Sequence, residues 1–288
     1  MTALVRSELM KIRTTNVWWL FSIGVLVFTF IMVAVWLAVG SEELAQAAGG
    51  TIPPPPDQSL EPSGRPEPRD LERVLRNTAS QVYTSGQFFG VMFAMLLGAI
   101  LVTNEFHHQT ATTTFLTTPK RTKVIVAKLI TAASAAVFFW LLTTLVGVIA
   151  GAIFFSLKGY PVQLTEWQVV RAMLMNGLAY GLWGVLGVGL GVLIRNQIGA
   201  VVTGAVAYII GTQAVQVIFF LVYEYLVKKD WVLTAMVAWP SMASQVMVSP
   251  EKIYPQSPAW WVGALVLIGY GVLFGTIGTL ITRKRDIS

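Results

Sequence analysis

Six mostly apolar stretches, each approaching or exceeding the length of a membrane span, constrain the fold of this chain more than any other feature. A helix needs about 20 consecutive apolar residues to cross the hydrocarbon core of a bilayer. The stretches are 17–40, 82–103, 124–157, 169–194, 198–227 and 260–282. With 55% hydrophobic and 12% charged residues, the chain is too apolar for an ordinary soluble domain. We therefore expect an all-α integral membrane protein with six transmembrane helices in a single transmembrane domain.

Two of these stretches need comment. The first is longer than the apolar region of a signal peptide, so we expect it to remain as a span. The second becomes strictly apolar only at Phe88, and polar residues precede this point: Gln81, Tyr83, Thr84, Ser85 and Gln87. Polar side chains inside a span usually face a cavity or a neighbouring helix. We expect the same of these residues.

An asymmetry of charge predicts how the chain lies in the membrane. Six spans place both termini on one side, and the side rich in Lys and Arg is cytoplasmic. Segments 1–16, 104–123, 195–197 and 283–288, with the adjoining span ends, hold eleven basic and three acidic residues, a net charge of +8. The opposite set, 41–81, 158–168 and 228–259 with its span ends, has a net charge of −2. We expect a multi-pass protein of the bacterial plasma membrane with both termini cytoplasmic.

The same asymmetry bears on partners. Basic residues beside membrane spans attract anionic lipid headgroups, so membrane lipids are an expected partner. No nucleic-acid partner is expected, because binding one would need a basic face on a soluble domain.

The connecting segments differ in kind. The 41–81 loop is rich in proline, which favours extended chain, but from Asp70 onward apolar residues recur at helical spacing and predict a short helix leading into the second span. The 195–197 connection is only a tight turn between two helices.

Catalytic and nucleotide-binding patterns are missing from the sequence. It contains no G-x-x-x-x-G-K-[ST] loop, so it cannot bind ATP by that route. His107 and His108 are adjacent and would project from a helix in different directions, which makes a metal pair improbable. Glu105 and Glu224 lie near opposite faces rather than as an intramembrane pair. We expect no enzyme, no metal and no cofactor bound by this chain.

The amino-terminal segment, 1–16, has the pattern of a helix lying on the membrane surface. At 100° per residue its apolar residues share one arc, with Arg6 and Arg13 opposite. Glu8 falls inside the apolar arc, where a charge is costly unless it is paired. Two interpretations remain open: Glu8 is solvated at the rim, or it pairs with a base of the next cytoplasmic segment, such as Lys120 or Arg121.

The cytoplasmic segment 104–123 contains a stretch that is marginal as a helix. Its threonines are modest helix formers, and Pro119 disfavours helix at the preceding residue. Phe115 and Leu116 are apolar on a loop that should be wet. They indicate either a surface that docks a partner or a connector that rests on the bilayer.

These segments together resemble a known family. The parts that carry the likeness are LVRSELMKIRTT at 4–15, a span, Glu105 and Thr110, and then Pro119, Lys120 and Arg121, which lead through AKL at 127–129 into the third span. In these parts the chain resembles the ABC-2 permeases. These are membrane subunits of bacterial ABC exporters, related in architecture to the ABCG transporters.

The resemblance implies a division of labour between chains. Segment 1–16 would be the connecting helix, and 110–116 the coupling helix that docks on a separately encoded ABC ATPase dimer, which binds ATP and magnesium. The residues expected to couple the two are Glu8, Glu105, Thr110, Phe115, Leu116, Pro119, Lys120 and Arg121. The resemblance also implies a second permease copy or a related permease, and a re-entrant outer region within 228–259.

The function expected from this resemblance is export of a hydrophobic or amphipathic substrate, such as a drug, lipid or peptide, by alternating access. Two alternatives remain open: a membrane sensor or immunity protein that does not transport, and an ion-coupled secondary transporter.

Glycine patterns predict close helix packing, since small residues let backbones approach. One stripe in the fourth span is formed by Gly177, Gly181, Gly184 and Gly191, and a second in the sixth span by Gly271, Gly275 and Gly278.

Overall fold

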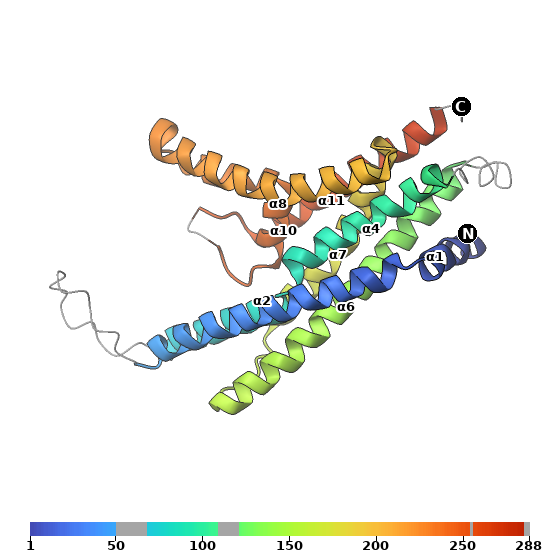
Figure 1. The fold of residues 1–288 in the computed structure, drawn as a ribbon. Helices are drawn as coiled ribbons and strands as arrows, with labels where there is room; N and C mark the ends of the chain where they lie inside the picture. The colour runs from blue at the N-terminus through green and yellow to red at the C-terminus, as the bar shows by residue number, and fades with distance from the viewer. Residues whose placement is uncertain (50–67, 109–120, 254–255, 285–288) are drawn as a thin grey trace.

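The computed structural model describes residues 1–49, 68–108, 121–253 and 256–284. Throughout these residues the regular structure is helical. Six helices are long and apolar enough to cross a membrane. They form a bundle in which both termini lie at the same end (Figure 1). The architecture is that of a multi-pass membrane protein, as the sequence predicts.

The helices have the following bounds in chain order: α1 Thr2–Thr14, α2 Val17–Ala47, α3 Pro68–Tyr83, α4 Gln87–His107, α6 Arg121–Lys158, α7 Trp167–Leu193, α8 Gln197–Leu221, η1 Val222–Val227, α9 Trp231–Ala235, η2 Met236–Ala238, α10 Pro240–Val248 and α11 Trp260–Lys284. With 38 residues, α6 is about 57 Å long at 1.5 Å per residue, well beyond the ~30 Å hydrocarbon core. The proline-rich loop expected at 41–81 is shorter than predicted, because α2 continues to Ala47 and α3 covers 68–81; residues 50–67 lie outside the described part of the chain.

The second span is interrupted near one end. The short helix expected from Asp70 is α3, which already begins at Pro68, and a break at 84–86 separates it from α4. A break inside a bundle frees backbone groups that must find new partners. The Tyr180 hydroxyl of α7 donates to the Gly86 carbonyl at 2.8 Å and lies 3.1 Å from the Thr143 hydroxyl of α6. Neighbouring helices thus hold the break in place.

The bundle is centred on α4, most of whose residues are buried, and its most extensive contact is with α7. Glycines let the two backbones approach closely. A Cβ added at Gly187 would lie 1.9 Å from the Met95 carbonyl oxygen, and one at Gly191 would lie 2.6 Å from that of Ala99. Gly98 of α4 meets the Gly184 carbonyl in the same way. Gly98 and Gly187 extend this contact beyond the predicted stripe.

The other glycines of the predicted stripes differ from one another. Gly177 packs on the Trp140 ring, but Gly181 faces open space, so the prediction of close packing is wrong there. Four residues turn a helix by about 400°, which carries Gly181 about 40° away from Gly177 and out of the contact. In α11, Gly271 lies near Leu182 of α7, whereas Gly275 and Gly278 make only ordinary van der Waals contacts.

The expected tight turn between the fourth and fifth spans is present. α7 ends at Leu193 and α8 begins at Gln197, and the Asn196 side chain caps α8 by accepting from the Gly199 N–H at 2.8 Å. α8 is the least buried of the spanning helices within this single chain. Most of its exposed side chains are apolar, including Ile198, Ile210 and Phe220, which suits contact with lipid or another apolar surface.

A bent helix pair lies in the 228–259 region for which a re-entrant segment is expected. The segments Trp231–Ala238 and Pro240–Val248 meet at 103°. Pro240 stands in the first turn of α10, where its missing N–H costs nothing. α10 packs against α7 and α11, and a Cβ at Gly263 would lie 2.4 Å from the Ala243 carbonyl oxygen. The geometry is that of a broken span or a re-entrant loop.

Candidate functional site: a buried ionic cluster

The amino-terminal helix α1 is attached to the bundle by a charged side chain. Glu8 is the one residue of α1 that is fully buried, with 4% of its surface exposed. Lys11 follows three residues later and therefore lies on the same face. The apolar arc of α1 thus brings a carboxylate and an ammonium group to the bundle.

Two further charged residues meet this pair from other helices. Glu105 lies in the last turn of α4 and is 6% exposed, while Lys128 lies near the start of α6 and is 1% exposed. Lys128 is flanked by buried apolar residues of its own helix, including Val124, Ile125 and Ala127. A lysine in such surroundings is costly unless anions compensate its charge.

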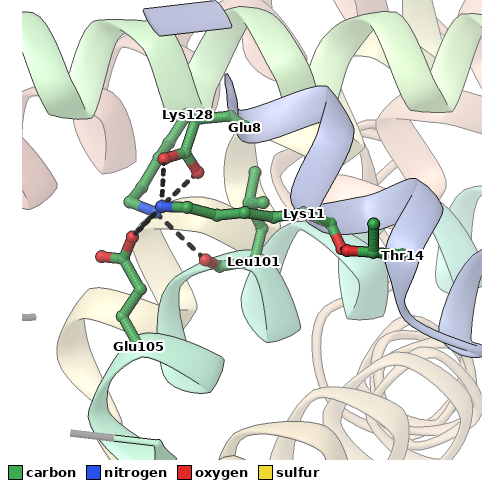
Figure 2. A network of polar contacts seen from close by, with 6 residues as sticks. All are labelled: Glu8, Lys11, Thr14, Leu101, Glu105 and Lys128. Atoms are coloured by element: carbon green, nitrogen blue, oxygen red, sulfur yellow. Dashed lines mark hydrogen bonds and ion pairs between the residues drawn. The ribbon is translucent and has the colours of Figure 1, made fainter. Parts of the chain in front are cut away.

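The four side chains form one closed ionic cluster, with both ammonium groups between the two carboxylates (Figure 2). Lys11 Nζ lies 2.6 Å from Glu8 Oε1 and 2.6 Å from Glu105 Oε1. Lys128 Nζ lies 2.8 Å from Glu8 Oε2 and 2.8 Å from Glu105 Oε1. Lys128 also donates to the Leu101 carbonyl at 3.3 Å. Two cations and two anions leave the cluster with no net formal charge.

The positions of the four residues make this a clamp between three helices. Leu101 and Glu105 are four residues apart and so lie on one face of α4, toward α6. Removing one member would leave a buried charge without compensation, which costs far more than an exposed ion pair is worth. The cluster therefore fixes α1, α4 and α6 relative to one another.

Lys11 is the exposed member, with 41% of its side-chain surface accessible. Burial lowers its pKa, but hydrogen bonds and charge interactions with Glu105 and Glu8 outweigh this and raise the pKa above its usual value of 10.5. A raised pKa stabilises the fold at pH values below 10.5, and this contribution is lost only as the pH rises through the higher value. Lys11 therefore stays charged throughout the physiological range.

The structure answers the question left open for Glu8. The carboxylate is paired rather than solvated, and its bases are Lys11 and Lys128. The expectation named neither of these bases: Lys11 belongs to α1 itself, and Lys128 lies within the third span. Thr110, Phe115, Leu116, Pro119 and Lys120 lie outside the described residues, and Arg121 is the first residue of α6.

Lys128 was missed as a functional candidate, although a signal was present. It is a lone lysine inside the apolar stretch 124–157. An ionisable residue within a span usually has a partner or a function. In the part of the chain that the structure describes, no group of three or more His, Cys, Asp or Glu side chains could hold a metal ion.

Glu8→Gln is expected to loosen α1 from the bundle, because it leaves two cations facing one anion. Trypsin should then cut faster after the exposed Arg13, since each 1.4 kcal/mol lost raises the detached fraction about tenfold. The matched control is Glu43→Gln, which neutralises an exposed glutamate of α2. Equal cleavage rates in the two variants would mean that the cluster does not hold α1.

Comparison with known proteins gives a family without an assigned activity. No curated protein matches the chain significantly. A family model described as "Protein of unknown function (DUF2705)" matches residues 68–288. The match includes Glu105 and Lys128 and begins after α2. The chain therefore belongs to the DUF2705 family.

Proposed function

We propose that this protein is the permease subunit of an ATP-driven exporter in the bacterial plasma membrane, powered by a separately encoded ABC ATPase. The observation that carries the proposal is the buried ionic cluster of Glu8, Lys11, Glu105 and Lys128. It lies at the end of the bundle that holds both termini (Figure 1). The proposed topology places this end in the cytoplasm, where an ATPase would bind.

The position of the cluster suits the transmission of a mechanical signal. α4 ends at His107 and α6 begins at Arg121, so the proposed coupling segment is joined directly to both helices. Glu105 and Lys128 lie close to these two junctions and are linked through Glu8 and Lys11 of α1. A displacement of the coupling segment would therefore move three helices together.

The opposite end of the bundle suits an outer region of a permease. The bent pair formed by α9, η2 and α10 would be the re-entrant segment, with α10 inserted between neighbouring helices. The exposed apolar face of α8 is available for a second permease subunit or for lipid.

An apolar cavity supports a hydrophobic or amphipathic cargo. Its volume is about 230 Å³, and it is lined by aromatic rings of α7, α8 and α11, including Trp183, Tyr208 and Phe274, and by Trp239, which precedes α10. Cavities of this kind bind apolar groups through burial of surface. Alternating access would expose such a surface first to the inside and then to the outside.

Phe115→Asp tests the proposal at the coupling segment. If an ATPase buries Phe115, each apolar side chain contributes about 1.5 to 3 kcal/mol, so the variant should bind the ATPase roughly 10- to 100-fold more weakly. The measurement is co-purification of the ATPase from membranes, together with its hydrolysis rate and the membrane level of the permease.

Two controls separate coupling from damage. Phe115→Leu keeps an apolar group and should retain the ATPase. Leu164→Asp adds the same charge to an exposed residue between α6 and α7 and should also retain it. Unchanged association and hydrolysis in Phe115→Asp would refute coupling through this segment. Absence of any co-purifying ATPase with the parent protein would favour a sensor or immunity protein instead.

A further inference from the structure

A second and larger cavity, with many polar residues among those that line it, lies in the half of the bundle away from the termini. Its volume is about 520 Å³, within the range of small-molecule sites. Side chains from α2, α3, α4, α8 and α10 contribute to its wall. Its polar lining residues include Asn77, Ser80, Gln81, Thr84, Ser85 and Ser244. Of the polar residues expected to face a cavity or a neighbouring helix, Gln81, Thr84, Ser85 and Gln87 line the cavity, and Tyr83 packs against Phe155 of α6.

The helical period of α3 explains how the polar wall arises. Asn77, Gln81 and Ser85 are four residues apart and so follow one face of the helix and its end. The other face carries Leu75 and Val82, which are buried in an apolar core with Leu44 and Phe155. α3 therefore turns its polar face toward the cavity. In a membrane protein such a face usually lines a water-filled space or a binding site.

Several polar atoms of this face have no partner among the described residues. They are buried oxygens: Asn77 Oδ1, Ser80 Oγ, Gln81 Oε1 and Ser85 Oγ. Ser80 and Ser85 are 1% and 5% exposed. Buried polar atoms normally have hydrogen-bond partners, because leaving one unpaired costs about 1 to 3 kcal/mol. Four such oxygens belong to one wall of one cavity, where a bound molecule would find unused hydrogen-bonding groups.

Three polar residues on α10 and at the start of α4, by contrast, already have hydrogen-bond partners in the protein. The Ser241 hydroxyl lies 2.7 Å from that of Thr212, and the Ser244 hydroxyl accepts from Trp183 Nε1 at 2.7 Å. Gln87 Nε2 donates to the Ser244 carbonyl at 3.1 Å. The unused hydrogen-bonding capacity is thus concentrated on α3.

The charge of the wall restricts what can bind. Of the described lining residues, only Glu251 and Lys252 are charged. Glu251 is already paired with Arg73 at 2.5 Å and lies 4.0 Å from Arg76. Lys252 is exposed, so its charge is hydrated. Beside the neutral amides and hydroxyls of α3 a charged ligand would lose its hydration without an opposite charge there to replace it. A neutral ligand with donors and acceptors would lose little.

We propose that this cavity is a binding site for an uncharged molecule, or an uncharged headgroup, that carries hydroxyl and amide groups. Hydroxyls both donate and accept, and amides do both with separate atoms, so they match the serine, asparagine and glutamine side chains of α3. The site is built within one chain. It would exist in an exporter or in a sensor, so it does not rest on the proposed transport function.

Cysteine protection tests the site directly, since the natural chain has no cysteine. Gln81→Cys places one thiol on the cavity wall, to be reacted with a small uncharged methanethiosulfonate reagent in lipid nanodiscs. Maltoside detergents are avoided because they carry the chemistry under test. N-acetylglucosamine, the free neutral probe, should slow the reaction about tenfold at ten times its Kd. Octyl glucoside below its micellar concentration tests the same chemistry as a headgroup.

Charge-matched probes and control sites make the outcome specific. Glucosamine and glucuronate, which carry opposite charges on a sugar of similar size, should protect much less. Thr165→Cys is exposed between α6 and α7 and should react without protection, whereas Thr29→Cys is buried and should not react. Asn77→Leu in the Gln81→Cys background should weaken protection roughly 2- to 10-fold, and Gln46→Leu, at an exposed site of α2, should not.

Each remaining result would overturn the proposal. Failure of Gln81→Cys to react would mean that the cavity is closed and dry. Reaction without protection by either neutral probe would mean a water-filled space only. Equal protection by neutral and charged sugars would exclude the selectivity inferred from the uncharged wall. None of these readings involves an ATPase, so they are independent of the test with Phe115→Asp.

Discussion

Replacing Lys128 with methionine is expected to lower the free energy of unfolding by about 3 to 5 kcal/mol, the usual cost of removing one partner from a buried ion pair. Methionine retains most of the length of the side chain, so the loss would come from charge rather than from an empty space. Glu8 and Glu105 would then face Lys11 alone. The measurement is unfolding in a graded series of denaturing detergent, together with the thermal midpoint of the purified protein.

Lys123→Met is the matched control, because Lys123 lies on the same helix but is exposed. Its effect should stay within about 0.5 kcal/mol. Similar losses for Lys123→Met and Lys128→Met would show that the cluster contributes nothing special to stability.

Removing a second charge from the cluster should cost less stability than removing that charge alone from the natural protein. The double variant Glu8→Gln, Lys128→Met keeps Lys11 and Glu105, which lie 2.6 Å apart and have opposite charges. Its destabilisation should therefore be smaller than the sum of the two single effects, with a coupling energy of about 0.5 to 3 kcal/mol. Strict additivity would mean that Glu8 and Lys128 do not interact in the protein.

The spans could be predicted from the sequence because burial in lipid requires a run of apolar residues, and this requirement is local. Five of the six spanning helices begin within three residues of their predicted starts. The second span was less well defined. Some of its polar opening residues belong to α3, and the position of the backbone break depends on the surrounding helices. The Tyr180 hydroxyl of α7, for example, donates a hydrogen bond to the Gly86 carbonyl at the break.

The ionic cluster could be predicted only in part. Helical periodicity identifies Glu8 as a charge on the apolar arc of α1, because periodicity can be read from the sequence of that helix alone. Its partners depend on how α4 and α6 pack, which a single sequence does not specify. For this reason the expectation names Lys120 and Arg121 of the cytoplasmic segment, and not Lys128, which lies within the third span.

Replacing Gly187 with alanine is expected to lower the free energy of unfolding by about 3 kcal/mol, close to the lower limit of the loss at Lys128, through packing instead of charge. The added Cβ would lie 1.9 Å from the Met95 carbonyl oxygen and 2.7 Å from its carbonyl carbon. Both are backbone atoms and cannot rotate away, so α4 and α7 would have to separate. Overpacking costs about 1 to 3 kcal/mol and occasionally more, and backbone contact places this variant at the upper end. Unfolding in graded denaturing detergent again gives the measurement.

Gly181→Ala gives the sharpest comparison, because it makes the same change on the same helix where nothing lies within 4 Å. Alanine favours helix over glycine by about 1 kcal/mol, so this variant should be as stable as the parent or slightly more so. If both variants behaved alike, the close contact between α4 and α7 would not exist in the protein. A selective loss at Gly187 would show that close contact of the two backbones holds α7 on α4. The C-terminal end of α4 carries Glu105, a member of the ionic cluster. Disturbing this contact should then also increase trypsin cleavage after Arg13, linking the packing of the bundle to the attachment of α1.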